Sequence, residues 1–417
     1  MKPERIQVNT EIHSGAGPRG ALYPGDCAQV LESLREAHAG GIKLIYMDPP
    51  YLTGEKFCMR VRVGEEGWRT GRGALRVPTF ADSRDRDEYL ARMRGVLCSC
   101  RELLSEDGMI FVHIDYRLHP HMRLLMDELF GEENFLNEII WVYQSGGRSM
   151  RHFSRKHDVI LFYRKTERCD FNIEAVMAPP AAPRTNHMRR HVDPDGRVYR
   201  SIRVGDRVYT YYDDDPVAPS DVWDDVSHLQ QKDPERTGYD TQKPLKLLDR
   251  IVRCGSRPGD WVLDPFAGSC TTLEAARKLG RNFIGIDRVP LTRNIARRRL
   301  AGAAYELPVP GGDAALEPAC DADVRTGIGF YHVSLNAFAV PVPGLEGGAP
   351  MDCVDNWSVG YLRSGSYEVM AEFARSRREG ALCTELRAPM YAGQLAMCVS
   401  DVLGRSWYFA LDKGDLA

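Results

Sequence analysis

The chain has 417 residues, of which 43% are hydrophobic and 27% are charged. This length predicts two or three structural units and excludes a single small binding module. The formal net charge of −3 disfavours a protein that coats nucleic acid nonspecifically, because that mode needs a large basic excess. The sequence shows no apolar run near the ~20 residues that span a bilayer and no signal peptide, so we expect a cytoplasmic protein without membrane contact.

Helices alternate with short apolar strands through the first 300 residues, which predicts an α/β layered sheet. The predicted helices are 28–36, 87–104, 120–129, 245–252 and 271–279, and the predicted strands are 42–47, 109–114, 139–143, 159–163, 261–263 and 283–286.

Two regions depart from this alternation. Residues 169–239 are polar, proline-rich and aromatic, which predicts an insertion that splits the sheet, with Tyr209–Tyr212 packing at a sheet edge. Residues 302–350 are dense in glycine and proline and predict a linker. Beyond it, a helix over 367–378 and strands over 395–399 and 407–411 predict a small α+β appendage, 351–417.

Neither the cysteines nor a histidine pair predicts a metal site. The eleven cysteines include no Cys-x-x-Cys, so reduced and mostly buried thiols are expected. His187 and His191 have the i, i+4 spacing of helical metal ligands, but no third ligand stands nearby. We expect them to face DNA or solvent.

One strand ends at Asp264, turns through Gly268 and starts a helix at Thr271. A parallel sheet binds cofactors at the carboxyl ends of its strands, and glycine lets backbone approach the ligand. Asp287 ends the next strand, near the ~20-residue offset at which an acid reaches ribose hydroxyls. Because Cys270 stands where a nicotinamide-type motif has its second glycine, a pyrophosphate cradle is disfavoured; a simple βα turn stays open from this segment alone.

The segment Asp48-Pro49-Pro50-Tyr51 also ends an apolar strand, so both segments should open on the same sheet edge. The two prolines fix φ and have no backbone N–H, so the loop is rigid and its carbonyl oxygens are free to accept hydrogen bonds. A carboxylate, a free carbonyl and an aromatic ring are what an amino group on a planar base requires. The alternative for this segment alone is a proline-rich turn that caps a strand.

Four segments together resemble bacterial amino-methyltransferases that act on DNA. These are 23–26, 44–54, 238–244 and 262–272, and the similarity covers roughly residues 20–300. The catalytic segment precedes the cofactor loop, which resembles the circularly permuted β class with its type III methylating subunits and related N6-adenine methyltransferases. The resemblance implies a Rossmann-like methyltransferase sheet with helices on both faces, divided as 1–168, a target-recognition region 169–239, and 240–301.

The resemblance also implies roles for individual residues. Asp48, Pro49, Pro50 and Tyr51 would be catalytic, and S-adenosylmethionine would be the cofactor. Asp264, Phe266, Ala267, Gly268 and Thr271 would line its methionine and ribose side, Asp287 would hold its ribose hydroxyls, Asp26 its adenine amino group, and Lys243 and Pro244 its methionine end. Two departures from the family pattern are Cys270, where glycine is frequent, and Asp240, where proline is common.

Two basic stretches could contact DNA. The segment with Arg148, Arg151, Arg155 and Lys156 resembles family members in which it lies beside the DNA cleft, so phosphate contact is expected there. The second stretch, with Arg293, Arg297, Arg298 and Arg299, is either a solvated face or part of a groove.

The sequence therefore predicts transfer of a methyl group to N6 of a flipped-out adenine in double-stranded DNA. Transfer to N4 of cytosine is the alternative, and structured RNA is a weaker one. A DNA-recognition or modification subunit that serves a restriction nuclease, a homodimer and, least favoured, a nicotinamide oxidoreductase also stay open.

Overall fold

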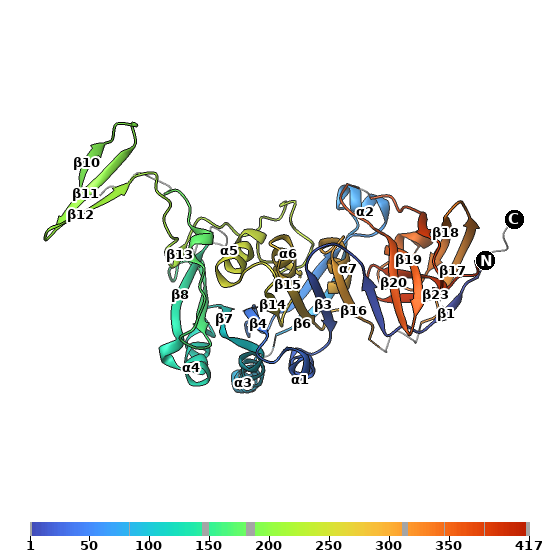
Figure 1. Cartoon of the computed structure of the whole chain (residues 1–417). Coiled ribbons are helices and arrows are strands. Elements are labelled where there is room, and N and C mark those ends of the chain that lie inside the picture. Colours follow the sequence, from blue (N-terminus) through green and yellow to red (C-terminus); the bar gives the residue numbers. More distant parts are fainter. Residues whose placement is uncertain are drawn as a thin grey trace.

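The structure, a computed structural model, describes residues 2–82, 84–143, 150–180, 188–310, 316–345, 347–378 and 380–413. In these residues a single 15-stranded sheet runs through the body of the molecule. Figure 1 shows an elongated molecule with a small arm at one end and a β-rich lobe, near both termini, at the other.

The middle of the sheet is parallel. Its neighbouring strands are β3 (Arg19–Pro24), β15 (Asn282–Asp287), β14 (Trp261–Asp264), β4 (Ile42–Met47) and β7 (Leu104–Ile114), and β9 (His157–Arg164) and β8 (Phe135–Val142) continue it antiparallel. All six residues of β4 are buried, which explains why it reads as an unbroken apolar run rather than an alternating one.

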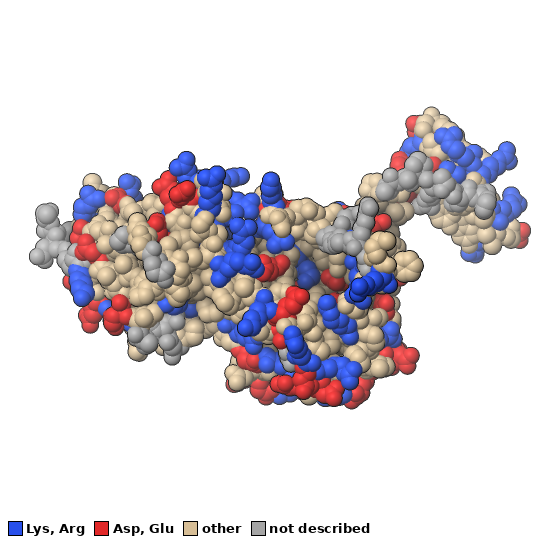
Figure 2. All heavy atoms as spheres, turned by 180° about the vertical axis from the view of Figure 1, so that it is seen from behind, with Lys and Arg blue, Asp and Glu red and all other residues tan. Residues whose placement is uncertain are grey.

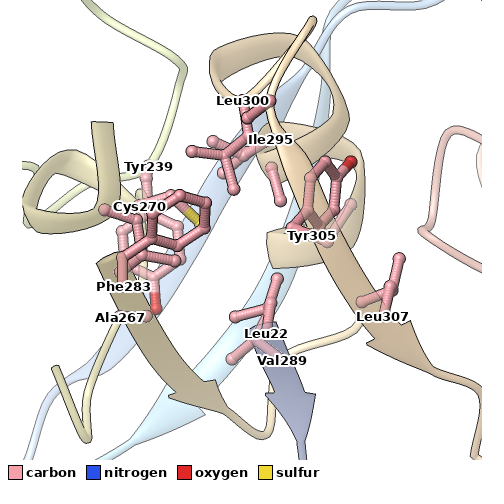
Figure 3. Packing of buried hydrophobic residues seen from close by; sticks show 14 of the residues in the cluster. Leu22, Tyr239, Ala267, Cys270, Phe283, Val289, Ile295, Leu300, Tyr305 and Leu307 are labelled. Carbon is pink, nitrogen blue, oxygen red and sulfur yellow. The ribbon is translucent and has the colours of Figure 1, made fainter. Parts of the chain in front are cut away.

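Helices cover both faces of this parallel region (Figure 1). One face carries α1 (Cys27–His38), α3 (Arg86–Leu103) and α4 (His119–Phe130), and the other carries α5 (Leu245–Gly255), α6 (Thr271–Lys278) and α7 (Leu291–Arg299). Figure 3 shows the second interface, where Ile295 of α7 and Leu300 just after it lie near Leu22 and Phe283 of the sheet. The predicted Rossmann-like sheet with helices on both faces is confirmed.

The predicted insertion builds the arm seen in Figure 1. Its three-stranded sheet consists of β10 (Arg189–Val192), β11 (Val198–Val204) and β12 (Arg207–Tyr212). The run Tyr209–Tyr212 does lie on an edge strand, as expected. Within it Tyr212 packs against Tyr199, at 5.6 Å between ring centroids, whereas Tyr209 and Tyr211 are 42% and 37% exposed. The chain then returns to the body, where β13 (Val222–Trp223) pairs with β8.

The C-terminal lobe extends the same sheet. Its strands are β16 (Ala304–Pro308), β2 (Thr10–His13), β20 (Ser366–Ala374), β19 (Val354–Arg363), β22 (Gln394–Asp401), β23 (Ser406–Ala410) and β1 (Glu4–Ile6), and a second sheet holds β17 (Ala319–Thr326), β18 (Phe330–Ala339) and β21 (Glu385–Pro389). The residues described after α7 contain 3-10 turns but no α-helix.

Two expectations for this lobe were wrong. The predicted helix over 367–378 is the strand β20, in which Tyr367 and Val369 are buried on alternate positions. Methionine, alanine and glutamate favour a helix locally, but pairing with β19 and β2 overrides that preference. The expected linker 302–350 holds β16, β17 and β18 rather than irregular chain.

A β-hairpin with a short helix follows the tetrapeptide. It consists of β5 (Lys56–Val61), α2 (Gly64–Thr70) and β6 (Leu75–Ala81), and it forms a separate two-stranded sheet. None of the helices in the described residues is long and apolar enough to cross a bilayer.

Candidate active site

A cavity opens at the carboxyl edge of the parallel strands. There β4 leads into Asp48, β14 ends at Asp264 and β15 ends at Asp287, and all three acids line the cavity. Because β15, β14 and β4 are adjacent and parallel, their carboxyl ends meet at one place. The tetrapeptide and the predicted cofactor loop are thus brought together as the sequence implied.

Asp48 is held from two sides within the tetrapeptide loop. The Tyr51 hydroxyl donates to Asp48 Oδ1, and the Lys243 ammonium forms an ion pair with Oδ2. Burial and the Asp48 charge raise the pKa of Tyr51 well above its ordinary 10, so the phenol stays protonated and remains a donor. The next residue, Leu52, has φ of 58°, a left-handed conformation that is strained for leucine.

A buried polar network beneath the tetrapeptide was not predicted. His113 of β7 is 0% exposed, and its ring lies against Tyr51 at 6.3 Å between centroids. Its Nδ1 is 2.9 Å from the Tyr46 hydroxyl and its Nε2 is 3.4 Å from Asp158 Oδ2, while Tyr143 donates to Asp158 Oδ1 at 3.1 Å. His113 is the one polar residue in the apolar run Met109–Ile114, and this was the signal that could have found it. Asp158 follows His157 at the start of β9, where polar residues are common, so it carried no such signal.

Asp264 anchors the cofactor loop. It is 3% exposed and accepts hydrogen bonds from the Phe266 N–H at 2.9 Å and from Thr272 Oγ1 at 2.5 Å. Burial raises its pKa to about 7, and the nearby charges of Asp48 and Asp287 act in the same direction. The site therefore favours a cationic ligand group, which would restore the charged carboxylate.

Backbone conformation shapes the loop that follows. Gly268 has φ of 44°, and a Cβ there would lie 3.2 Å from the Tyr239 ring. Its N–H donates to Asp287 Oδ2 at 2.7 Å. Cys270 has φ of 56°, so the position where relatives frequently carry glycine does use the conformation that glycine favours. Figure 3 shows Cys270 packed close to Tyr239.

Most predicted cofactor residues line the cavity, and two do not. Lys243, Asp264, Phe266, Ala267, Gly268, Thr271 and Asp287 line it. Pro244 instead precedes α5 as its N-cap. Asp26 caps α1 by accepting from the Ala28 N–H at 3.0 Å and pairs with Arg92 at 2.5 Å, although its neighbours Gly25 and Cys27 reach the cavity.

Asp240 accepts a hydrogen bond from the Cys58 N–H at 3.1 Å. It thereby ties the segment before Lys243 to β5. The departure from proline at this position thus has a structural use in this chain.

Several cavity residues were missed. Tyr239, Tyr89 and the stacked pair Phe57 and Phe80, whose centroids are 4.8 Å apart, all line it. The Tyr89 hydroxyl is buried without a hydrogen-bond partner among the described residues. A buried donor without a partner is costly, so this hydroxyl is suited to a polar group of a ligand.

The first basic stretch follows β8 and precedes β9 at this same edge, since Val159 of β9 is opposite Ile114 of β7. Arg151 and Arg155 are exposed, and the Arg155 guanidinium lies 4.1 Å from the Tyr116 ring centroid. Lys156 is half-buried. Arg148 lies outside the described residues.

The second basic stretch is not a solvated face. Arg293 and Arg297 are 3% and 4% exposed. Arg297 pairs with Glu11, Arg298 with Asp355 and Arg299 with Glu274. These arginines hold α7 against its neighbours.

His191 lies on a strand rather than a helix, bonded to Ser201 at 2.9 Å, and His187 lies outside the described residues. Within the described ranges no three histidine, cysteine or acidic side chains group as metal ligands.

The chain is similar to known DNA-modifying enzymes. Residues 42–297 match the family model described as DNA methylase. The type II methyltransferase M.EcaI of Enterobacter cloacae is 29% identical over 305 residues, and the match covers 62% of this chain and 64% of that enzyme. The DNA adenine methyltransferase YhdJ of Escherichia coli is 29% identical over 261 residues, covering 62% of this chain and 75% of that enzyme.

A similar fold occurs among solved structures. The PvuII DNA methyltransferase (cytosine-N4-specific) has a TM-score of 0.46 and 16% identity, over 69% of this chain and 87% of that one. The match to M.EcaI spans less than two thirds of that enzyme. Since the family model spans more than half of the chain and contains Asp48, Asp264 and Asp287, the chain belongs to the N6/N4 DNA methylase family.

Proposed function

We propose that the chain transfers a methyl group from S-adenosylmethionine to the N6 amino group of an adenine flipped out of double-stranded DNA. The observation that carries the proposal is the convergence of Asp48, held by Tyr51 and Lys243, with the Asp264–Thr271 loop in one cavity. Family membership supports amino methylation of DNA.

The cavity suits S-adenosylmethionine in charge and shape. Asp264, with its raised pKa, is matched to the cofactor's positive charge. Asp287 accepts from the Gly268 and Val289 N–H groups at 2.7 Å each, and a carboxylate keeps further lone pairs for ribose hydroxyls. A Cβ at Gly268 would crowd the Tyr239 ring at 3.2 Å, so glycine lets these two parts of the cavity wall pack closely. When bound, the cofactor supplies an electrophilic methyl group.

The chain's own residues position the base. Asp48 and the Pro49 carbonyl accept from the two amino hydrogens and aim the nitrogen lone pair at the methyl group. Tyr51 offers its aromatic surface to the base, while His113 supports the ring from within the protein. Burial raises the pKa of Cys270, so the thiol stays protonated, and the reaction needs no covalent enzyme intermediate.

Adenine is proposed over cytosine on two grounds. An Asp at the first position of the tetrapeptide leans toward adenine within the family, and the relative YhdJ bears the name of an adenine methyltransferase. Cytosine N4 presents nearly the same amino geometry and is the alternative. Digestion of modified DNA followed by nucleoside mass spectrometry separates N6-methyladenine from N4-methylcytosine.

The chain also fits the circularly permuted β class. Asp48 precedes Asp264 in sequence, yet their strands β4 and β14 are neighbours, and the arm β10–β12 comes between them along the chain. The arm is then the target-recognition element, and Arg151, Arg155 and Lys156 contact phosphates at the cavity edge. Type II relatives support a role in a restriction-modification system.

The test is Asp48→Ala in a tritiated-methyl transfer assay on duplex DNA. Transfer should fall below detection while calorimetric binding of S-adenosylmethionine stays close to wild type, because Asp48 is assigned to the base. Asp225→Ala, an exposed acid paired with Arg250, is the matched control. Retained turnover by Asp48→Ala would sink the assignment.

A further inference from the structure

Four arginines from three parts of the chain gather beside the cavity, and we call them the arginine cluster: Arg60, Arg62, Arg76 and Arg377. Arg60 lies on β5 directly opposite Arg76 of β6. Burial, together with the positive charges of Arg377, Arg298 and Arg60, lowers the pKa of Arg62. Arg377 follows β20 and so belongs to the C-terminal lobe.

Within the described ranges no carboxylate forms an ion pair with any of the cluster's four members. The Arg377 guanidinium donates to the backbone carbonyls of Asp233 and Arg236 at 3.3 and 3.4 Å, which leaves its charge without a carboxylate partner. Like charges directly opposite on paired strands are destabilising. The neighbouring Arg298 differs, because it is paired with Asp355 at 2.5 Å. An external anion would offset the repulsion that the fold leaves in place.

The arginine cluster stands on a fixed scaffold. Arg375 is 2% exposed and donates to the carbonyls of Val354, Met351 and Gly380. These bonds hold the segment from which Arg377 projects. Arg62 lies 5.3 Å from the centroid of the Trp68 ring. Guanidinium groups set in place this way lose less freedom on binding an anion.

The cluster also lies close to the cavity mouth. Phe57 of β5 and Ala81 of β6 line the cavity, and Arg60 is three residues beyond Phe57, about 10 Å along a strand. The Arg60 N–H donates to the Gly238 carbonyl at 3.0 Å, next to cavity-lining Tyr239. Figure 2 shows basic side chains gathered beside a hollow near the middle of the molecule.

We propose that the arginine cluster binds backbone phosphates of the DNA that flank the target base, which makes the C-terminal lobe part of the DNA-binding surface. The inference rests on the proposed function. Guanidinium groups bind phosphate oxygens through paired N–H donors, and phosphate contacts fix position without reading sequence. The cluster therefore binds DNA of any sequence.

The experiment measures duplex binding by fluorescence anisotropy from 50 to 300 mM salt. The variant Arg60→Gln/Arg76→Gln/Arg377→Gln removes the three exposed members and leaves Arg62 on Trp68. The slope of log K against log salt should become shallower by about 2 to 3, since each lost contact contributes about 0.9. The loss should be equal on random-sequence DNA, with S-adenosylmethionine binding unchanged.

The matched control removes three exposed charges elsewhere: Arg101→Gln/Arg325→Gln/Arg387→Gln, on α3, β17 and β21. Arg377→Lys should recover most of the slope that Arg377→Gln loses, because the charge returns. If the wild type binds and methylates DNA while the triple variant matches the control, the inference is overturned and the proposed function stands. If the wild type neither binds nor methylates duplex DNA, both fall.

Discussion

Lys243 and Asp48 form an ion pair across the cavity although 195 residues separate them in sequence. Their side chains are 12% and 16% exposed. The pair joins the base-binding loop to the segment before α5. The Asp48 carboxylate therefore depends on Lys243 for its charge balance.

Replacing Lys243 by methionine leaves the Asp48 carboxylate without its partner in a largely buried place. We expect a loss of roughly 1–3 kcal/mol in the free energy of unfolding, below the full cost of breaking a buried pair, and a marked fall in turnover. Urea unfolding and single-turnover methyl transfer measure the two effects. The control Lys246→Met removes an exposed pair with Asp225 and should cost under about 1 kcal/mol. Equal losses of stability and turnover in both variants would contradict a special role for the pair between Lys243 and Asp48.

Asp264 should make cofactor binding depend on pH. Its pKa is raised to about 7 by burial, and a cationic cofactor favours the ionised carboxylate, so binding releases a proton. Affinity for S-adenosylmethionine should therefore rise about tenfold from pH 6 to pH 8. Calorimetry across this range measures it, and Asp264→Asn should bind more weakly with a flat profile. A flat wild-type profile would refute the role of Asp264.

The buried Tyr89 hydroxyl predicts opposite effects on stability and on substrate use. Tyr89→Phe removes a hydroxyl with no partner in the described part of the chain and should stabilise the free protein by about 1 kcal/mol. The KM for DNA or cofactor should rise several-fold, since a ligand group loses its partner. Tyr391→Phe, at a side chain 50% exposed, should change neither; a Tyr89→Phe enzyme with unchanged KM would leave the hydroxyl without a binding role.

The site was predictable where strand and loop are contiguous in sequence. Asp48 and Asp264 each follow an apolar strand, so their meeting at one edge follows from parallel pairing. His113 and Tyr239 could not be assigned to the site, because the residues that they contact there, such as Tyr51 and Gly268, are far from them in sequence. The arm was predicted as an insertion with Tyr209–Tyr212 at a sheet edge, but not as a separate three-stranded sheet, since its strands carry arginine and tyrosine on exposed faces. At β20, the helix preference of the local residues masked the strand-like alternation of buried Tyr367 and Val369. The segment is a strand because it pairs with β19 and β2.

The junction between the parallel sheet and the C-terminal lobe should depend on one buried pair. Arg297 donates to both Glu11 oxygens at 2.9 and 2.7 Å, and Tyr408 donates to Glu11 Oε2 at 2.9 Å. Glu11→Gln leaves the Arg297 charge buried without compensation, which should cost about 3–5 kcal/mol in urea unfolding. Glu317→Gln breaks the exposed pair with Arg5 and should cost under about 1 kcal/mol; similar costs would show that the junction is not specially stabilised.

The same junction should limit stability at both acid and alkaline pH. Burial opposes ionisation of Glu11, but Arg297 and His13 outweigh it and hold the pKa of Glu11 well below 4.5. The contribution of Glu11 to the free energy of unfolding is therefore complete above pH 4.5 and is lost as the pH falls through the pKa of the folded state. Burial also opposes protonation of His13, yet Glu11 and Glu372 raise its pKa above 6.5. The contribution of His13 to the free energy of unfolding is therefore complete below pH 6.5 and is lost as the pH rises through the pKa of the folded state. Urea midpoints should peak between about pH 4.5 and 6.5, and His13→Gln should flatten the alkaline decline; an unchanged decline would assign it to other groups.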